Sequence, residues 1–416
     1  MRFWNKNSFI KNVGSIFSTK VLLYIVGIVS SIYLARILGA DGKGKLAIVT
    51  SVYGIALQFG CMGMHTAHTY YISQNRDVIK KCEGNIVFLT IASLVVSFLL
   101  LPFFVVNNYI LNLNNFLLII AFLLIPCNLF TMLQENLFIS IGHIKQFNII
   151  EFLNNTLYFF FLLLISCFWK VSVEVVTICM LISIIIIDLY SLKVYFGEIE
   201  KTIRFSGKFL LEILPYGIKS YCSCLICYLI LRADIFMLNY FRDNFEVGIY
   251  SLATSLIDLT YMVSSSICII LFPHLGTLKS LKEKLKTLKK VFFVAIPVMI
   301  VIYLFLGILS PYVVNILYGK QFSEASKVLI FLIPGAFCWS TANYFFQFFL
   351  SEKNFAPTLI IPVLSLIINI ILNFNLIPLY GNIGAAIAST VAYGVCFLGM
   401  MISLFIYINR CKEKNN

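Results

Sequence analysis

The chain has 416 residues, of which 60% are hydrophobic and only 12% are charged, with a formal net charge of +13. Soluble domains contain about 45–50% apolar and about 25% charged residues, so this composition excludes a water-soluble protein. The positive charge does not indicate nucleic-acid binding, because the lysines and arginines gather in short gaps between apolar runs and leave no separate basic domain.

Apolar runs long enough to cross a membrane follow one another along the chain. A transmembrane helix needs about 20 such residues to cross about 30 Å of hydrocarbon. The first run is too long for a signal peptide and lacks a convincing cleavage site, so we expect it to be retained as a span. We predict an all-α integral membrane protein with about twelve transmembrane helices, although eleven or thirteen also fit the short gaps. The twelve runs lie near residues 13–35, 46–72, 84–106, 115–139, 148–169, 173–196, 209–233, 247–273, 290–316, 327–350, 356–379 and 383–408.

Two short sequence matches relate the first half of the chain to the second. Gly44-Lys-Leu-Ala-Ile-Val-Thr-Ser begins the second run and Gly248-Ile-Tyr-Ser-Leu-Ala-Thr-Ser begins the eighth, while Lys145-Gln-Phe and Lys353-Asn-Phe precede the fifth and the eleventh. Because six spans is an even number, both halves enter the membrane in the same orientation, as in the parallel repeats of transporters. We predict two pseudo-symmetric six-helix halves around a central cleft. The expected division is 1–196, a cytoplasmic linker at 197–208, and 209–416.

The distribution of lysine and arginine predicts the orientation of the chain in the membrane. If the N-terminus is cytoplasmic, 21 of the 31 lysines and arginines fall in inner gaps and 5 fall in outer gaps. Positive charge accumulates on the cytoplasmic side of membrane proteins. We therefore expect both termini in the cytoplasm.

Four cations within or at the ends of spans are the candidate substrate-binding residues. Lys20 and Lys219 lie near mid-depth on the first span of each half, and Arg36 and Arg232 lie near the outer ends of the same spans. Ionisable groups inside a membrane are costly and usually face a cavity. A pseudo-symmetric set of cations suits a diphosphate, which needs charge neutralisation and several hydrogen-bond donors. The alternatives are that the long side chains snorkel to the interface, or that the arginines only mark span ends.

Acidic residues within spans are candidates for a coupling group or a charge partner. Asp258 lies about eleven residues into the eighth run, where it either neutralises a basic residue or carries a coupling proton, and Glu135 and Glu151 also lie within spans. The sequence has no nucleophile elbow, no metal-ligand grouping and no nucleotide motif, so we expect no enzyme activity, no bound metal and no cofactor.

Several short segments, in this order and spacing, resemble one family of transporters. They are Arg36-Ile-Leu-Gly, Arg232-Ala-Asp234, Gly248-Ile-Tyr-Ser-Leu-Ala, Leu317-Tyr-Gly-Lys-Gln-Phe, and the stretch from Asn369-Ile-Ile-Leu-Asn373 through Pro378 to Gly384-Ala-Ala-Ile-Ala. Together they resemble the polysaccharide-exporter family of bacterial inner-membrane flippases, of which the O-antigen flippases are typical. This family belongs to the superfamily that also contains multidrug extruders and the lipid II flippase.

The resemblance implies a flippase that moves an undecaprenyl-diphosphate-linked oligosaccharide, an O-antigen or capsule repeat unit, from the cytoplasmic to the periplasmic leaflet by alternating access. It also implies the polymerase and ligase of lipopolysaccharide biosynthesis as functional partners, besides the membrane lipids. One alternative is a multidrug cation antiporter, which would need prominent acidic residues in its cavity. The other is an O-antigen polymerase, which would need a large outer loop, whereas no outer gap here exceeds about 15 residues.

Overall fold

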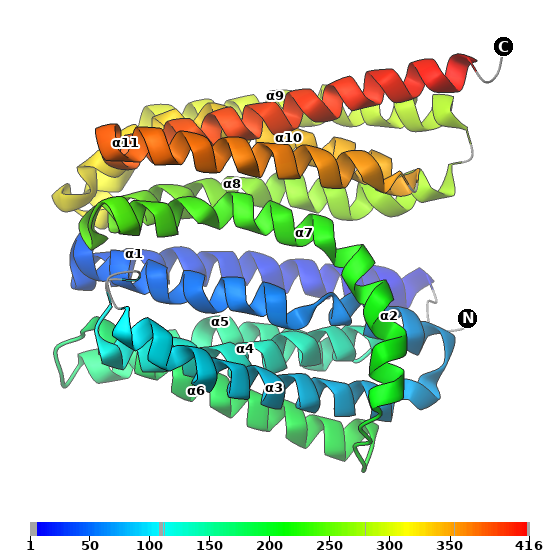
Figure 1. The fold of residues 1–416 in the computed structure, drawn as a ribbon, viewed down its shortest axis with the longest axis horizontal. Coiled ribbons are helices and arrows are strands. Elements are labelled where there is room, and N and C mark those ends of the chain that lie inside the picture. The colour runs from blue at the N-terminus through cyan, green and yellow to red at the C-terminus, as the bar shows by residue number, and fades with distance from the viewer. Residues whose placement is uncertain (1–5, 108–110, 112, 279, 353, 414–416) are drawn as a thin grey trace. The chain divides into compact units, whose positions relative to one another are not determined.

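All regular secondary structure in the described residues is helical, as predicted. The computed structural model describes residues 6–107, 111, 113–278, 280–352 and 354–413. The elements are α1 (Lys6–Cys61), α2 (Met64–Gln74), η1 (Arg76–Val78), α3 (Ile79–Val106), α4 (Asn115–Ile141), α5 (Ile144–Ser166), α6 (Val173–Val194), η3 (Tyr195–Ile199), α7 (Gly207–Phe241), α8 (Asn244–Thr277), α9 (Leu281–Val313), η4 (Val314–Tyr318), η5 (Lys320–Phe322), α10 (Ser323–Ser351) and α11 (Phe355–Glu413) (Figure 1).

Two long elements, α1 and α11, are each a pair of helices joined at a glycine. Gly39 has φ 68° and ψ −175°, and Gly381 has φ 57° and ψ −133°. Side chains with a Cβ rarely adopt such a positive φ, so glycine permits the chain to change direction there. In the described part of the chain, nine helical segments are long and apolar enough to cross a membrane, and the bent α1 and α11 account for two of them. If both arms of α1 and of α11 are counted separately and α7 is added, the number of spans agrees with the predicted twelve.

The helices form two compact units, which we call the N-terminal half (residues 1–225) and the C-terminal half (226–416). The boundary falls inside α7. The polar segment at 197–208 contains the end of the π-helical element η3 and the non-helical stretch before α7. The division of the two predicted domains at this segment remains a prediction.

The pattern of burial repeats between the halves. The fourth predicted span of each half is mostly buried: 67% of the most apolar stretch of α4 and 61% of that of α10. The third predicted span of each half has few buried residues, since only 11% of the corresponding stretch is buried in α3 and 17% in α9. Within the N-terminal half, α4 packs against α1, α2, α3, α5 and α6; within the C-terminal half, α10 packs against α8, α9 and α11. Each half therefore has its fourth span at its centre, which supports the predicted six-helix repeat.

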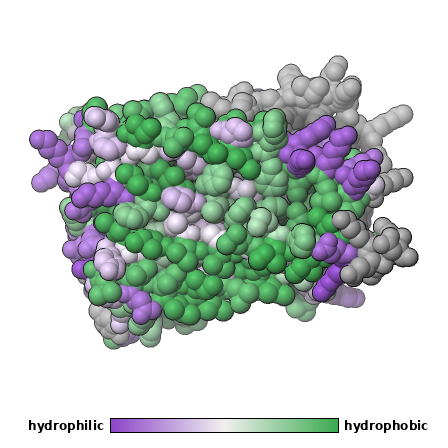
Figure 2. Space-filling model, turned by 90° about the horizontal axis from the view of Figure 1, so that it is seen from above, coloured by the Kyte–Doolittle hydropathy of each residue, from purple (hydrophilic) through white to green (hydrophobic). Residues whose placement is uncertain are grey.

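Large apolar side chains lie exposed on the outer helices. Leu99 on α3 and Phe293 and Ile308 on α9 are 73%, 82% and 69% exposed. Figure 2 shows hydrophobic residues in green over most of the middle of this face, with hydrophilic residues in purple gathered towards its left and right sides. Continuous exposed apolar surface of this kind is stable only against lipid. The chain is a multi-pass membrane protein.

Two charged residues hold the bend of α11 in place. The guanidinium of Arg242 donates from Nε to the carbonyl oxygen of Ile377 at 3.2 Å and from Nη2 to that of Pro378 at 2.8 Å. On the other side of the bend, Oε2 of Glu246 accepts the backbone N–H of Asn382 at 2.8 Å. Carbonyl and N–H groups released by the bend thus find side-chain partners instead of remaining unsatisfied.

Replacing Gly381 with alanine is expected to destabilise the protein by about 2 kcal/mol or more, because the substitution combines a left-handed backbone cost with a steric clash. A methyl group there would overlap the carboxylate of Glu246. Gly142 provides a matched control, since its φ is +87° but nothing lies within 4 Å of an added Cβ. Thermal unfolding of the purified variants measures the difference; equal midpoints for Gly381→Ala and Gly142→Ala would contradict the role of Glu246.

Candidate functional site in the C-terminal half

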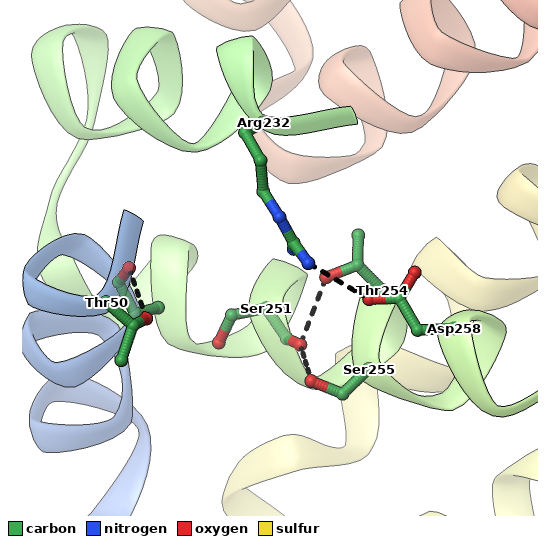
Figure 3. A network of polar contacts seen from close by, with 7 residues as sticks. Thr50, Arg232, Ser251, Thr254, Ser255 and Asp258 are labelled. Atoms are coloured by element: carbon green, nitrogen blue, oxygen red, sulfur yellow. Dashed lines mark hydrogen bonds and ion pairs between the residues drawn. The ribbon is translucent and has the colours of Figure 1, made fainter. Parts of the chain in front are cut away.

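The structure brings together two of the predicted site residues, Arg232 on α7 and Asp258 on α8. Nη2 of Arg232 lies 3.3 Å from Oδ2 of Asp258, and the two side chains are 31% and 50% exposed. Figure 3 shows the guanidinium extending from α7 towards α8, where the carboxylate meets it. Because neither group is sealed, both retain hydrogen-bonding capacity for another molecule. Paired charges inside the depth of a membrane protein are typical of substrate or ion pathways.

A narrow cavity of about 40 Å³ adjoins this ion pair. Its walls are largely apolar and include the aromatic side chains of Tyr303, Trp339 and Tyr393. The rings of Trp339 and Tyr393 pack with their centroids 5.2 Å apart. A water molecule needs about 10–15 Å³ of such volume, so the cavity has room for a few waters and not for a sugar. The apolar walls lower the local dielectric and strengthen any electrostatic interaction that Arg232 makes.

Hydroxyl groups on α8 lie beside the ion pair. Oγ1 of Thr254 and Oγ of Ser255 both donate to the carbonyl oxygen of Ser251, at 3.1 and 2.6 Å (Figure 3). Each hydroxyl has therefore used its one proton within its own helix and presents only oxygen lone pairs outwards. Thr254 also lines the cavity.

A fully buried polar network begins two residues after Arg232, at Asp234. This side chain accepts hydrogen bonds from the Tyr250 hydroxyl at 2.5 Å, from Nδ2 of Asn373 at 2.8 Å, and from the Ser389 hydroxyl. Nδ2 of Asn373 also donates to Oδ1 of Asn369 at 3.0 Å. The network joins α7 to α8 and to both arms of α11. It thereby fixes the turn of α7 that carries Arg232.

The other predicted site residues are placed as follows. Arg36 is exposed and lies on the first arm of α1, three residues before its bend, whereas Glu135 on α4 and Glu151 on α5 are half-buried. Lys20 and Lys219 lie outside the residues whose side chains the structure describes. The functional roles of all these residues remain predictions.

Reasoning from the sequence did not identify the Asp234 network as a unit. In the sequence, Asp234, Tyr250, and the pair of Asn369 and Asn373 lie in separate motifs, and Ser389 lies in none of them. A signal was present, because Asn369 and Asn373 are four residues apart and so share one face of an otherwise apolar helix. Their partners, however, are far away in the sequence and are revealed only by the fold.

The model of one protein family, described as polysaccharide biosynthesis protein, matches residues 9–279 of the chain. The chain belongs to this family. The match covers the N-terminal half from residue 9 onwards. It also covers Arg232, Asp234, Tyr250 and Asp258, so it includes the ion pair and one side of the buried network.

Two curated relatives of this family member come from archaea. The chain is 29% identical over 167 residues to a probable low-salt glycan biosynthesis flippase, Agl15, of Haloferax volcanii, a match covering 39% of this chain and 35% of that protein. It is 24% identical over 408 residues to an uncharacterized membrane protein, MJ1068, of Methanocaldococcus jannaschii, covering 88% of this chain and 79% of that protein. The first match thus spans about a third of that relative's length.

Solved structures share the fold. The lipid II flippase MurJ in an inward closed conformation aligns with a TM-score of 0.76 at 18% identity, over 95% of this chain and 87% of that chain. A multidrug resistance MATE family transporter in an inward-facing conformation aligns with a TM-score of 0.77 at 13% identity, over 95% and 96% of the two chains. At these identities the likeness shows a common fold and does not distinguish a flippase from an antiporter.

Proposed function

We propose that the protein is a flippase that moves an undecaprenyl-diphosphate-linked oligosaccharide from the cytoplasmic to the outer leaflet of a cell membrane. The observation that carries this proposal is membership of the polysaccharide biosynthesis family in a chain that spans the membrane many times. The relative from Haloferax volcanii bears the name of a probable glycan biosynthesis flippase, and one structure of the same fold is a lipid II flippase. Both support a flippase rather than an enzyme.

The physical task explains why such a protein needs a polar path. A diphosphate and a chain of sugars cannot cross hydrocarbon unaided, because each unsatisfied polar group costs several kcal/mol. In our proposal the halves shield the head group in a cleft and expose it alternately to each side, while the lipid tail stays in the bilayer. Lys20, Arg36, Lys219 and Arg232 neutralise the diphosphate, and Asp258, Glu135 and Glu151 act as charge partners or coupling groups.

The cellular setting belongs to the same proposal. We place the protein in the bacterial inner membrane with both termini in the cytoplasm, in the pathway of an O-antigen or capsule repeat unit, followed by a polymerase and a ligase. The excess of positive charge in the inner gaps of the sequence supports this orientation.

The second candidate is a multidrug cation antiporter, because a MATE transporter shares the fold. An organic cation would be bound by a carboxylate that no basic residue neutralises. In the C-terminal half, Asp258 lies against Arg232, which supports an anionic substrate instead.

Complementation tests the proposal in a strain that lacks its own flippase for the lipid-linked glycan. We expect the wild-type protein to restore surface polysaccharide, and the double substitution Lys20→Ala with Lys219→Ala to lower export about tenfold or more at normal protein level, because two charge-assisted interactions with phosphate are lost.

Lys289→Ala is the matched control, since Lys289 is an exposed residue of α9 outside the proposed site and should leave export unchanged. Failure of the wild-type protein to restore export, in strains that make O-antigen and in strains that make capsule, would contradict the flippase function. Full export by the double variant would contradict only the proposed role of the two lysines.

A further inference from the structure

A second, larger cavity lies entirely within the N-terminal half. Its volume is about 330 Å³, which is within the range of about 300–1,000 Å³ found for small-ligand pockets. It is lined by residues of α1, α4, α5 and α6, most of which lie near the middle of these helices. Its polar side chains include Thr50, Asn128, Asn154, Asn155, Tyr158 and Ser183.

Several side chains of this cavity each donate one hydrogen bond within the helix that carries them. Nδ2 of Asn128 donates to the carbonyl oxygen of Leu124 at 2.8 Å, and Nδ2 of Asn155 donates to that of Glu151 at 2.8 Å. The Ser183 hydroxyl likewise donates within α6, to the carbonyl oxygen of Cys179 at 2.6 Å. Asn128 and Asn155 each therefore retain a carbonyl oxygen and one N–H for a ligand, whereas the Ser183 hydroxyl retains only oxygen lone pairs.

Asn154 differs from the other two asparagines. Its amide makes no hydrogen bond with any residue that the structure describes, so both its N–H donors and its carbonyl acceptor remain available. A polar group at this depth in the membrane is costly unless it meets a partner. An amide whose donors and acceptor are all available at the wall of this cavity is a group that a polar ligand entering it can use.

The chemistry of these walls distinguishes between the parts of a lipid-linked glycan. No lysine, arginine, histidine, aspartate or glutamate lines the described cavity. A diphosphate carries only acceptors and a concentrated negative charge, so the neutral amides would have to hold that charge with no cation to compensate it. A sugar hydroxyl both donates and accepts, and it can use the acceptor oxygens of Asn128 and Asn155 together with the full amide of Asn154.

The two halves use equivalent positions of the sequence repeat for different chemistry. Thr50 of the N-terminal half and Thr254 of the C-terminal half occupy the same place in the repeated segment, and each lines the cavity of its own half. Each hydroxyl donates to the carbonyl oxygen three residues earlier, at 3.0 and 3.1 Å (Figure 3). The cavity beside Thr254 contains an ion pair, whereas the cavity beside Thr50 is uncharged.

We propose that the N-terminal cavity binds a neutral sugar ring of the transported glycan, through hydroxyls that donate to Asn128 and Asn155 and that exchange hydrogen bonds with Asn154. This inference rests on the proposed flippase function and adds to it a separate site for the glycosyl part. The site makes transport respond to the presence of the sugar and not only to the diphosphate.

The test compares binding of glycosylated and bare lipid diphosphate to the full chain. The probes are farnesyl diphosphate, and farnesyl diphosphate carrying one glucose, one galactose or one N-acetylglucosamine. The protein is held in phospholipid nanodiscs, because maltoside and glucoside detergents would themselves present sugars. We expect at least one sugar to tighten binding about tenfold over bare farnesyl diphosphate, the change produced by two hydrogen bonds of ordinary net strength.

The double variant Asn128→Leu with Asn154→Leu should lose this gain and should bind bare farnesyl diphosphate as the wild type does, which also reports that it is folded. Asn136→Leu is the matched control, since Asn136 lies on α4, makes the same hydrogen bond four residues back at 2.8 Å, and does not line the cavity. If no sugar tightens binding to the wild type, or if the double variant keeps the full gain, the sugar site is overturned and the flippase function stands. If the wild type binds none of the probes, the proposed function fails and this inference fails with it.

Discussion

Replacing Asp234 with alanine is expected to lower the free energy of unfolding by about 3–5 kcal/mol and to remove most of the protein from the membrane. The side chain is 1% exposed and accepts hydrogen bonds from Tyr250, Asn373 and Ser389. Without it, three buried donors lose their partner in a region that water cannot reach, and each such loss costs about 1–3 kcal/mol. Immunoblots of membranes and thermal unfolding of purified protein measure the effect.

Two milder substitutions at the same network should give a graded series. Tyr250→Phe removes one donor and leaves the carboxylate with its other partners, so a loss of about 1–3 kcal/mol is expected. Asp234→Asn should be worse than Tyr250→Phe, because both carboxylate oxygens accept hydrogen bonds. An amide nitrogen in the place of Oδ1 would face the N–H of Asn373, and one in the place of Oδ2 would force the two hydroxyl groups to reverse their hydrogen bonds.

Asp41→Ala is the matched control for loss of a carboxylate. Asp41 forms an ion pair with Lys45 at 2.8 Å, but its side chain is 57% exposed, and exposed pairs of this kind contribute little. If Asp234→Ala accumulated and unfolded like Asp41→Ala, the buried network would not be what joins α7 to α8 and α11.

The sequence predicted the architecture well because lipid imposes one dominant rule on it. Long apolar runs must become helices, since only a helix satisfies its own backbone hydrogen bonds in hydrocarbon. The bends at Gly39 and Gly381 agree with this rule, because both glycines lie in gaps between predicted spans, where the chain must change direction. The exact ends of the spans were less predictable, because α1 and α11 continue through those gaps as nearly unbroken helix.

The partners of individual polar residues were the part that the sequence did not reveal. From the sequence, Asp258 is equally a candidate charge partner and a candidate coupling group. Its contact with Arg232 depends on how α7 and α8 pack against each other, which the sequence does not reveal. Hydrophobic periodicity carries little information about such pairs, because nearly every neighbouring position is apolar whichever way it faces. The uncharged cavity beside Thr50 was missed for the same reason: asparagines and serines were scattered over four spans without a recognisable spacing.

Substituting Arg232 with alanine is expected to lower glycan export about 10- to 100-fold per folded molecule. If Arg232 contacts the diphosphate, its loss removes a charge-assisted hydrogen bond worth about 1.5–3 kcal/mol. Asp258→Asn keeps the cation and removes only the group that orients it, so a smaller loss, about threefold, is expected. Export is measured as surface polysaccharide in the complementation strain and divided by the amount of protein in the membrane.

A charge swap separates a substrate contact from a structural ion pair. The double substitution Arg232→Asp with Asp258→Arg keeps one charge of each sign at the 3.3 Å contact but moves the cation from α7 to α8.

Lys284→Ala serves as the control, because it breaks another ion pair of the same half. This pair joins Lys284 to Glu352 at 2.6 Å, and the two side chains are only 9% and 17% exposed. Burial raises the pKa of Glu352, but the hydrogen bonds from Lys284 and Tyr407 and the charge of Lys284 outweigh this effect and hold the pKa below its usual range. The Glu352 carboxyl group is therefore ionised at neutral pH.

We expect Lys284→Ala to reduce the amount of protein while leaving export per molecule unchanged, since the pair stabilises the fold at the end of α10. The charge swap should do the opposite, restoring abundance relative to Arg232→Ala but leaving export low, because a phosphate site depends on where the cation is held. Recovery of full export by the swapped pair would show that Arg232 and Asp258 only brace two helices, and the diphosphate would then have to be bound by other cations.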